Sequence, residues 1–214
     1  YDNLDYRHWD KDNDGRFNHP FVATYDNGKI GEAIDLLEGQ PFYTPTVPFG
    51  GAEDYVWAPD GKSVLYVCKK KFGKDYVTST NTDIFQYVLA TKETKNLTEG
   101  MLGYDNHPEF SADGKRLVWT SMKTDGYEAD KNDIIIMDVN SGVKLNLTAH
   151  WDETVNSYKW SKDGKKIYFV APKGGTVQLF AVDVPTNLNV RSLPKIEQIS
   201  EGQFDVSGIV GETK

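Results

Sequence analysis

The hydrophobic residues of this chain occur in short runs that are separated by polar turn residues at regular intervals. Three of the runs follow an Asp-Gly-Lys tripeptide, and an aromatic residue stands three positions before each Asp. The three copies span Trp57–Val67, Phe110–Trp119 and Trp160–Val170. Gly permits a positive φ, and the Asp carboxylate accepts hydrogen bonds within its own turn. Each copy therefore predicts a strand, a tight turn and a second strand.

A second predicted hairpin follows each Asp-Gly hairpin. It begins with a strand at Asp83–Val88, Asp133–Asp138 or Gln178–Val182, and it ends near a Leu-Thr or Ile-Ser pair. Four strands therefore recur with a period of about 50 residues, which is typical of a blade in a β-propeller.

The fold class that follows is all-β, a partial β-propeller with three full four-stranded blades, a half blade and a leading strand. Asn27-Gly28 predicts the half blade, a hairpin of two strands at 17–25 and 29–37. The predicted units run along the chain as an irregular segment at 1–16, the half blade at 17–38, blades at 39–103, 104–150 and 151–203, and the first strand of a further blade at 204–214. The incomplete units at both ends favour an arc of a larger ring, and a closed ring of four blades is the alternative.

Composition and charge narrow the range of partners. The 214 residues carry a net charge of −8, so the phosphates of nucleic acids and of anionic membrane surfaces would repel the chain. No apolar run approaches the roughly 20 residues that span a bilayer, so no membrane span is expected. The polar first residues indicate no signal peptide. The one cysteine, Cys68, excludes an internal disulfide, and its apolar neighbours predict a buried side chain.

No metal and no cofactor is predicted. Asp10–Gly15 matches the first half of a calcium-binding EF-hand loop, but the twelfth position, which should be Glu, is Phe21. The four histidines lack metal-ligand spacing, and His107 and His150 are expected to form hydrogen bonds near the first strands of two blades. Two Asn-Leu-Thr sequons occupy equivalent strand ends in the repeat, which explains them without glycosylation.

The repeat resembles the propellers of TolB and of prolyl oligopeptidase-family serine peptidases, and the segments between its copies resemble bacterial dipeptidyl aminopeptidases and acylaminoacyl-peptidases. These segments are Tyr6–Asp10, Asp14–Arg16, His19–Val22, Ser79–Phe85, Ser121–Lys131 and Trp151–Val155. The resemblance implies a propeller that precedes an α/β-hydrolase domain of the same polypeptide. It also implies that the propeller covers the active site and admits short peptide substrates.

No catalytic residue is predicted in this chain, because it lacks the Gly-x-Ser-x-Gly motif that carries a serine nucleophile. The resemblance implies that the full-length protein is a serine peptidase whose Ser-His-Asp triad lies beyond Lys214. The expected function is therefore a non-catalytic propeller region of a serine exopeptidase, which gates and positions short peptides for the hydrolase domain. One alternative is a TolB-like propeller that binds protein partners without an enzymatic domain. Another is a sugar- or metabolite-active propeller enzyme, which requires a His/Asp/Glu cluster that the pattern does not show.

Acidic loops supply the candidate binding residues. In a propeller, the loops between the second and third strands share a face with the loops between blades, here 72–82, 100–107, 123–132 and 150–156. The resemblance implies that propeller carboxylates hold the α-ammonium group of a peptide through charge-assisted hydrogen bonds. The residues expected to contribute are Glu128 and Asp130, then Asp152 and Glu153, with Tyr127 beside them. A solvated loop rim is the alternative interpretation.

The expected location is periplasmic or secreted, because the peptidases that the chain resembles, with loops rich in Asp and Asn, are often exported. A cytoplasmic location is the alternative, and the lack of disulfides fits it.

Overall fold

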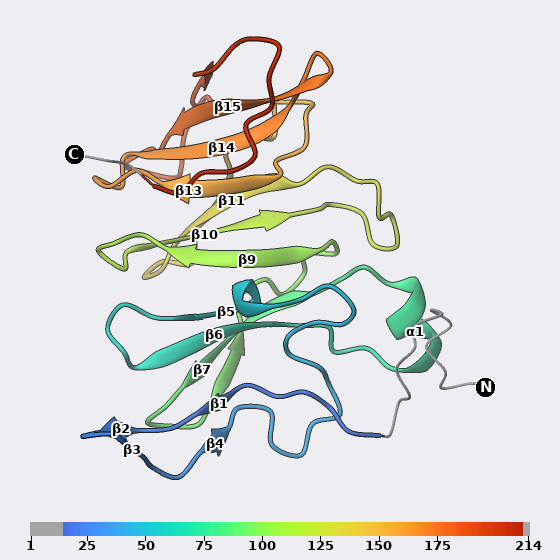
Figure 1. The fold of residues 1–214 in the computed structure, drawn as a ribbon, viewed down its shortest axis with the longest axis vertical. Helices are drawn as coiled ribbons and strands as arrows, with labels where there is room; N and C mark the ends of the chain where they lie inside the picture. The colour runs from blue at the N-terminus through green and yellow to red at the C-terminus, as the bar shows by residue number, and fades with distance from the viewer. Residues whose placement is uncertain (1–14, 212–214) are drawn as a thin grey trace.

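The computed structural model describes residues 15–211, which are built almost entirely from antiparallel β-sheets. Three four-stranded sheets lie one above the other, and a region of short strands precedes them (Figure 1). This arrangement confirms the predicted all-β fold class. The sheets form an open stack rather than a closed ring, as a partial propeller requires. We refer to the three four-stranded sheets, in chain order, as the first, second and third blade.

Each blade is an antiparallel sheet whose strands follow the order of the chain. The first blade contains β5 (Tyr55–Trp57), β6 (Ser63–Cys68), β7 (Asp83–Val88) and β8 (Thr94–Asn96). The second contains β9 (Asp105–Phe110), β10 (Arg116–Ser121), β11 (Asp133–Asp138) and β12 (Lys144–Asn146). The third contains β13 (Ser157–Trp160), β14 (Lys166–Lys173), β15 (Thr176–Asp183) and β16 (Ile196–Gln198).

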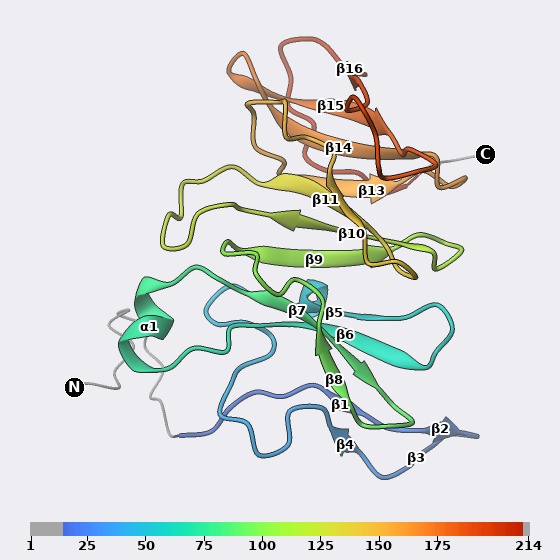
Figure 2. The same cartoon turned by 180° about the vertical axis from the view of Figure 1, so that it is seen from behind.

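Two short helices lie outside the sheets, on connections that the sequence does not predict as helical. A 3-10 helix, η1 (Ala52–Asp54), stands directly before β5, and α1 (Gly73–Thr78) lies in the connection from β6 to β7. In Figures 1 and 2, α1 lies at the end of the stack that carries the β6–β7 and β10–β11 connections, whereas η1 lies between the first blade and β9.

The three Asp-Gly turns have the predicted structure. Gly61, Gly114 and Gly164 have φ values of 68°, 68° and 69°, in the left-handed region that glycine tolerates. In each turn the Asp carboxylate accepts a hydrogen bond from the backbone nitrogen two residues later, at distances of 2.9, 3.0 and 3.0 Å. The side chain thus closes the turn between the first and second strands of every blade.

Apolar side chains pack between neighbouring blades and fix their spacing. On β10, Leu117 and Trp119 contact the first blade, whereas Val118 contacts the third, because successive side chains of a strand point to opposite faces. All three side chains are completely buried. The largest cluster joins the second and third blades and includes Ile136 and Phe169. Burial of such apolar surface stabilises the stack by about 25 cal/mol per Å².

The N-terminal hairpin has shorter strands than predicted. Its strands are β1 (Phe21–Val22), β2 (Tyr25–Asp26), β3 (Lys29–Ile30) and β4 (Ile34–Asp35), with β2 paired to β3 and β1 paired to β4. Asn27 and Gly28 form the expected turn with positive φ. The prediction of two continuous strands on either side of that turn is wrong. Tyr25 and Ile30 are 75% and 77% exposed, so little apolar burial supports pairing near the tip.

The strand predicted at Phe204–Val210 is also wrong, because the structure has no strand within 204–211. The segment instead crosses the beginning of β15. The backbone nitrogen of Val206 donates to the carbonyl oxygen of Val177 (2.8 Å), and the nitrogen of Val177 donates to the Asp205 carboxylate (2.7 Å). These two bonds hold the segment without a continuous ladder.

The two Asn-Leu-Thr sequons end the fourth strand of two blades in the same way. The hydroxyls of Thr98 and Thr148 donate to the carboxylates of Asp83 and Asp133 at 3.0 and 2.8 Å. Each hydroxyl also accepts a hydrogen bond from the backbone nitrogen of the residue after that Asp. Both threonines are completely buried. This Asp–Thr bridge joins the start of the third strand to the end of the fourth. It explains structurally why Asn-Leu-Thr recurs at this point of the repeat.

Candidate functional site

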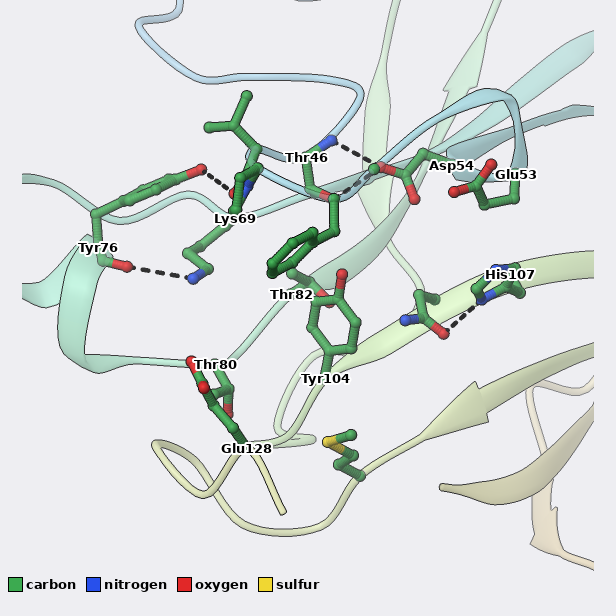
Figure 3. A pocket seen from close by; sticks show the side chains of 16 residues that line it. Thr46, Glu53, Asp54, Lys69, Tyr76, Thr80, Thr82, Tyr104, His107 and Glu128 are labelled. Atoms are coloured by element: carbon green, nitrogen blue, oxygen red, sulfur yellow. Dashed lines mark hydrogen bonds between the residues drawn. The ribbon is translucent and has the colours of Figure 1, made fainter. Parts of the chain in front are cut away.

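A cavity of about 400 Å³ opens on the face where the connecting segments of the first and second blades meet (Figure 3). Four segments form its walls: the connection before β5, the β6–β7 connection, the start of β9 and the β10–β11 connection. The lining residues are Thr46, Val47, Pro48, Phe49, Gly50, Glu53, Asp54, Lys69, Tyr76, Thr80, Thr82, Tyr104, Asn106, His107, Met122 and Glu128. Three of the four loops predicted to share one face contribute to this lining. The fourth, 150–156, is hydrogen-bonded to the 123–132 loop through Asn132 but does not line the cavity. The prediction omitted the connection before β5.

Asp54 closes a loop within the segment before β5, in the cavity wall. It is 2% exposed, and its Oδ2 accepts hydrogen bonds from the backbone nitrogen and the hydroxyl of Thr46, at 2.7 and 2.8 Å. Burial raises the pKa of Asp54 and outweighs the two Thr46 hydrogen bonds, which lower it. The neighbouring Glu53 is exposed and lines the same cavity. The 3-10 helix η1 thus presents two carboxyl groups side by side.

Lys69 stabilises the opposite wall of the cavity through contacts with the β6–β7 connection. Its ammonium group donates to the carbonyl oxygens of Ser79 (2.7 Å) and Tyr76 (3.2 Å), and it lies 4.7 Å from the centre of the Tyr76 ring. The Tyr76 hydroxyl in turn donates to the carbonyl oxygen of Val47 at 3.2 Å. The Tyr76 contact joins the β6–β7 connection to the segment before β5. The positive charge of Lys69 interacts with the carbonyl oxygens and the ring of its own wall.

The start of β9 contributes Tyr104, Asn106 and His107. His107 has a φ of 53°, and the pairing of β9 with β10 shifts register beside it, as in a β-bulge. Nδ1 of His107 lies 2.9 Å from Oδ1 of Asn106, so the predicted hydrogen bonding of His107 is confirmed. Burial raises the pKa of the Tyr104 hydroxyl, which keeps this side chain neutral in the cavity.

Of the five residues predicted for the site, Glu128 lines the cavity. Tyr127 is 54% exposed and Asp130 is half-buried, and neither belongs to the lining. Asp130 accepts hydrogen bonds from the backbone nitrogens of Lys123 (3.1 Å) and Thr124 (2.8 Å), so its carboxylate closes its own loop.

Asp152 and Glu153 lie in the connection between the second and third blades, outside the cavity lining. Asp152 is exposed, and the Glu153 carboxylate lies 3.8 Å from the ammonium group of Lys173 on β14. The sequence missed Glu53, Asp54 and Thr46. They lie in the connection that precedes the first blade. This connection is equivalent to the connections between blades, and that equivalence could have predicted its place on the same face.

The cavity suits a positively charged guest that also carries apolar surface. Glu53, Asp54 and Glu128 bring carboxyl groups to it, and Pro48, Phe49 and Met122 are among its apolar lining. Carboxylates form strong charge-assisted hydrogen bonds with ammonium groups.

Cys68 is fully buried in β6, as predicted, and burial raises the pKa of its thiol to about 11. Within residues 15–211, no three His, Cys, Asp or Glu side chains are grouped so that they could hold a metal ion. Most of the EF-hand-like stretch at 10–15, and residues 1–14 of the predicted irregular segment, lie outside the described residues. None of the helices described here is both long and apolar enough to cross a bilayer.

Sequence comparison finds relatives that share nearly the whole chain. A protein of Porphyromonas gingivalis named dipeptidyl-peptidase 5 is 39% identical over 202 residues, which are 94% of this chain. One of the same name from Porphyromonas endodontalis is 41% identical over 205 residues, or 96% of this chain. The chain is homologous to one segment of dipeptidyl-peptidase 5. It spans 28% of the length of each of these two relatives. No protein-family model matches the chain.

Solved structures agree with the fold. The β-propeller domain of the Trilobed protease from Pyrococcus furiosus has a TM-score of 0.52 and 16% identity, over 87% of this chain and 49% of that one. A puromycin-hydrolysing peptidase from Mycobacterium tuberculosis has a TM-score of 0.51 and 16% identity, over 85% of this chain and 29% of that one. At this identity the likeness shows the fold alone. The sheets of this chain are blades of a partial β-propeller.

Proposed function

We propose that this chain is the non-catalytic propeller region of a serine exopeptidase of the dipeptidyl-peptidase or acylaminoacyl-peptidase type. It admits and positions short peptides for an α/β-hydrolase domain elsewhere in the same polypeptide. The observation that carries the proposal is the match to dipeptidyl-peptidase 5 along 94% of the chain, at 39% identity. The match covers 28% of that relative, which leaves room there for a separate catalytic domain.

The cavity between the first and second blades is the site at which this region receives the peptide. The α-ammonium group of the peptide lies near Glu53 and Glu128, and the apolar lining accommodates its first side chain. A charge-assisted contact of this kind fixes the peptide by its amino end. The scissile bond then lies at a set number of residues from that end, as removal of dipeptides requires.

The test uses the full-length protein and three reagents. Dipeptide 4-nitroanilides with a free amino group report dipeptidyl-peptidase activity, and N-acetylated amino-acid 4-nitroanilides report acylaminoacyl-peptidase activity. A fluorophosphonate probe labels an activated serine. We expect labelling and cleavage of one substrate class by the full-length protein, and neither by residues 1–214 alone. A full-length protein that resists the probe and cleaves neither substrate would instead support a propeller that only binds partners.

We also infer that the protein is exported, to the periplasm or beyond the cell. The support is the resemblance to exported peptidases with loops rich in Asp and Asn. Cell fractionation with an antibody against the protein tests the location, and recovery with cytoplasmic markers would contradict it.

A further inference from the structure

One carboxylate joins the connecting segments of the first and second blades beside the cavity. Oδ1 of Asp125 accepts hydrogen bonds from the hydroxyl of Ser79 (2.7 Å) and from the backbone nitrogens of Thr80 (2.9 Å) and Asn81 (3.2 Å). Asp125 lies in the β10–β11 connection, whereas its three donors follow α1 in the β6–β7 connection. A single side chain thus collects three donors from another blade.

A second contact brings the same two segments together. The backbone nitrogen of Gly126 donates to the hydroxyl of Thr80 at 3.0 Å. Gly126 has a φ of 76°, and a Cβ at this position would lie 3.1 Å from the carbonyl oxygen of Thr78. Only glycine combines this backbone conformation with so close an approach.

The loop that Asp125 anchors is itself compact. Asp130 accepts hydrogen bonds from the backbone nitrogens of Lys123 and Thr124, and its own backbone nitrogen donates to the carbonyl oxygen of Tyr127 at 3.1 Å. Residues 123–130 therefore shift as a unit if their anchor is lost. Glu128 belongs to this unit, and both Glu128 and Thr80 line the cavity (Figure 3).

The anchor is charged at neutral pH. Burial raises the pKa of Asp125, but the hydrogen bonds from Ser79, Thr80 and Asn81 outweigh burial and leave this pKa below its usual value. Hydrogen bonds to an ionised carboxylate are stronger than those between neutral groups.

We propose that Asp125 is a positioning residue that docks the 123–130 loop on the first blade and thereby places Glu128 against the amino end of the bound peptide. The role of Glu128 rests on the proposed function. The docking rests on the three hydrogen bonds to Asp125 and the close approach at Gly126.

The test compares Asp125→Ala, Glu128→Gln and the double variant in the full-length protein. For a free-amine dipeptide substrate, we expect Asp125→Ala to raise KM by about tenfold with kcat nearly unchanged, because a charge-assisted contact in the bound state is lost. In the Glu128→Gln background the same change should add less than about twofold, since the two residues act through one contact. Asp125→Asn, which keeps an acceptor oxygen, should lie between wild type and Asp125→Ala.

Hydrogen exchange of the 123–130 amides gives a readout that is independent of peptidase activity. We expect faster exchange in Asp125→Ala, and a smaller increase in Ser79→Ala, which removes one of the three donors. Asp113→Ala, which removes a turn carboxylate at the other end of the second blade, should leave these amides unchanged. Unchanged exchange in Asp125→Ala, or equal KM effects in both backgrounds, would overturn the positioning role. No effect of Glu128→Gln on KM would overturn the proposed peptide contact.

Discussion

The indole nitrogen of Trp119 donates a hydrogen bond of 2.9 Å to Oδ1 of Asp105, inside the second blade. Both residues are completely buried, and Oδ2 of Asp105 has no hydrogen-bond partner within residues 15–211. Burial raises the pKa of Asp105 to about 7, against the opposing effect of the nearby Ser121 hydroxyl and of the Trp119 hydrogen bond, and the nearby Asp83 raises this pKa further. The folded protein therefore holds a proton on Asp105 at pH values at which the unfolded chain has lost it.

Because of this raised pKa, the free energy of unfolding decreases as the pH increases. The native state binds more protons than the unfolded state between about pH 4 and pH 7, so the contribution of Asp105 to stability is present at low pH and declines across that interval. We expect Asp105→Asn, which mimics the protonated acid, to flatten the dependence of the free energy of unfolding on pH. Urea denaturation of both proteins at pH 5 and pH 8 measures this difference in the free energy of unfolding.

The exposed Asp152→Asn serves as the control for Asp105→Asn, with an unfolding profile like that of the wild type. An Asp105→Asn protein that retained the full loss of stability from pH 5 to pH 8 would show that another group binds the proton.

The buried Asp–Thr bridge gives a second stability prediction. In Thr148→Val, the Asp133 carboxylate loses a donor and the backbone nitrogen of Ile134 loses its acceptor. Leaving buried polar groups unpaired costs about 1–3 kcal/mol, so we expect a loss of that size in the free energy of unfolding. Thr148→Ser retains the hydroxyl and should lose much less. Equal losses in both variants would assign the effect to packing of the methyl group.

Much of the fold could be predicted because its signals are local. Asp113 and Gly114 form their turn through bonds within a few residues, and the short apolar run Leu117–Trp119 that follows is typical of a buried strand. The strand predicted at Phe204–Val210 shows the limit of such signals. A strand requires a neighbouring strand with free backbone groups, and Val206 meets β15 at a single backbone bond.

The candidate site was harder to predict because distant segments build it. The sequence indicated Glu128 from its acidic loop, but Asp54 stands at an ordinary position in a Gly-rich connection, and its importance comes from burial against Thr46. Asp130 satisfied the same sequence criteria as Glu128, yet its carboxylate folds back to cap Thr124. Which acidic side chain caps its loop and which faces the cavity depends on backbone geometry that the pattern does not contain.

The thiol of Cys68 should be inert in the folded protein. It is fully buried, and the pKa of about 11 leaves almost no thiolate at pH 7.5, the form that reacts with disulfide and maleimide reagents. We expect no reaction with 5,5′-dithiobis(2-nitrobenzoate) over an hour under native conditions, and complete reaction in 6 M guanidinium chloride. Fast reaction without denaturant would show that the first blade opens at β6.

Glu53 should contribute to peptide binding together with Glu128. It is exposed in the cavity wall, next to Asp54, whose raised pKa makes it the weaker source of negative charge. In the full-length enzyme, we expect Glu53→Gln to raise KM for free-amine dipeptide substrates by about three- to tenfold while kcat changes little, as loss of one charge-assisted contact implies. Glu93→Gln, an exposed change in the turn between β7 and β8, is the matched control and should leave KM unaltered. If Glu53→Gln and Glu93→Gln gave the same KM as the wild type, the amino end of the peptide would have to lie away from η1.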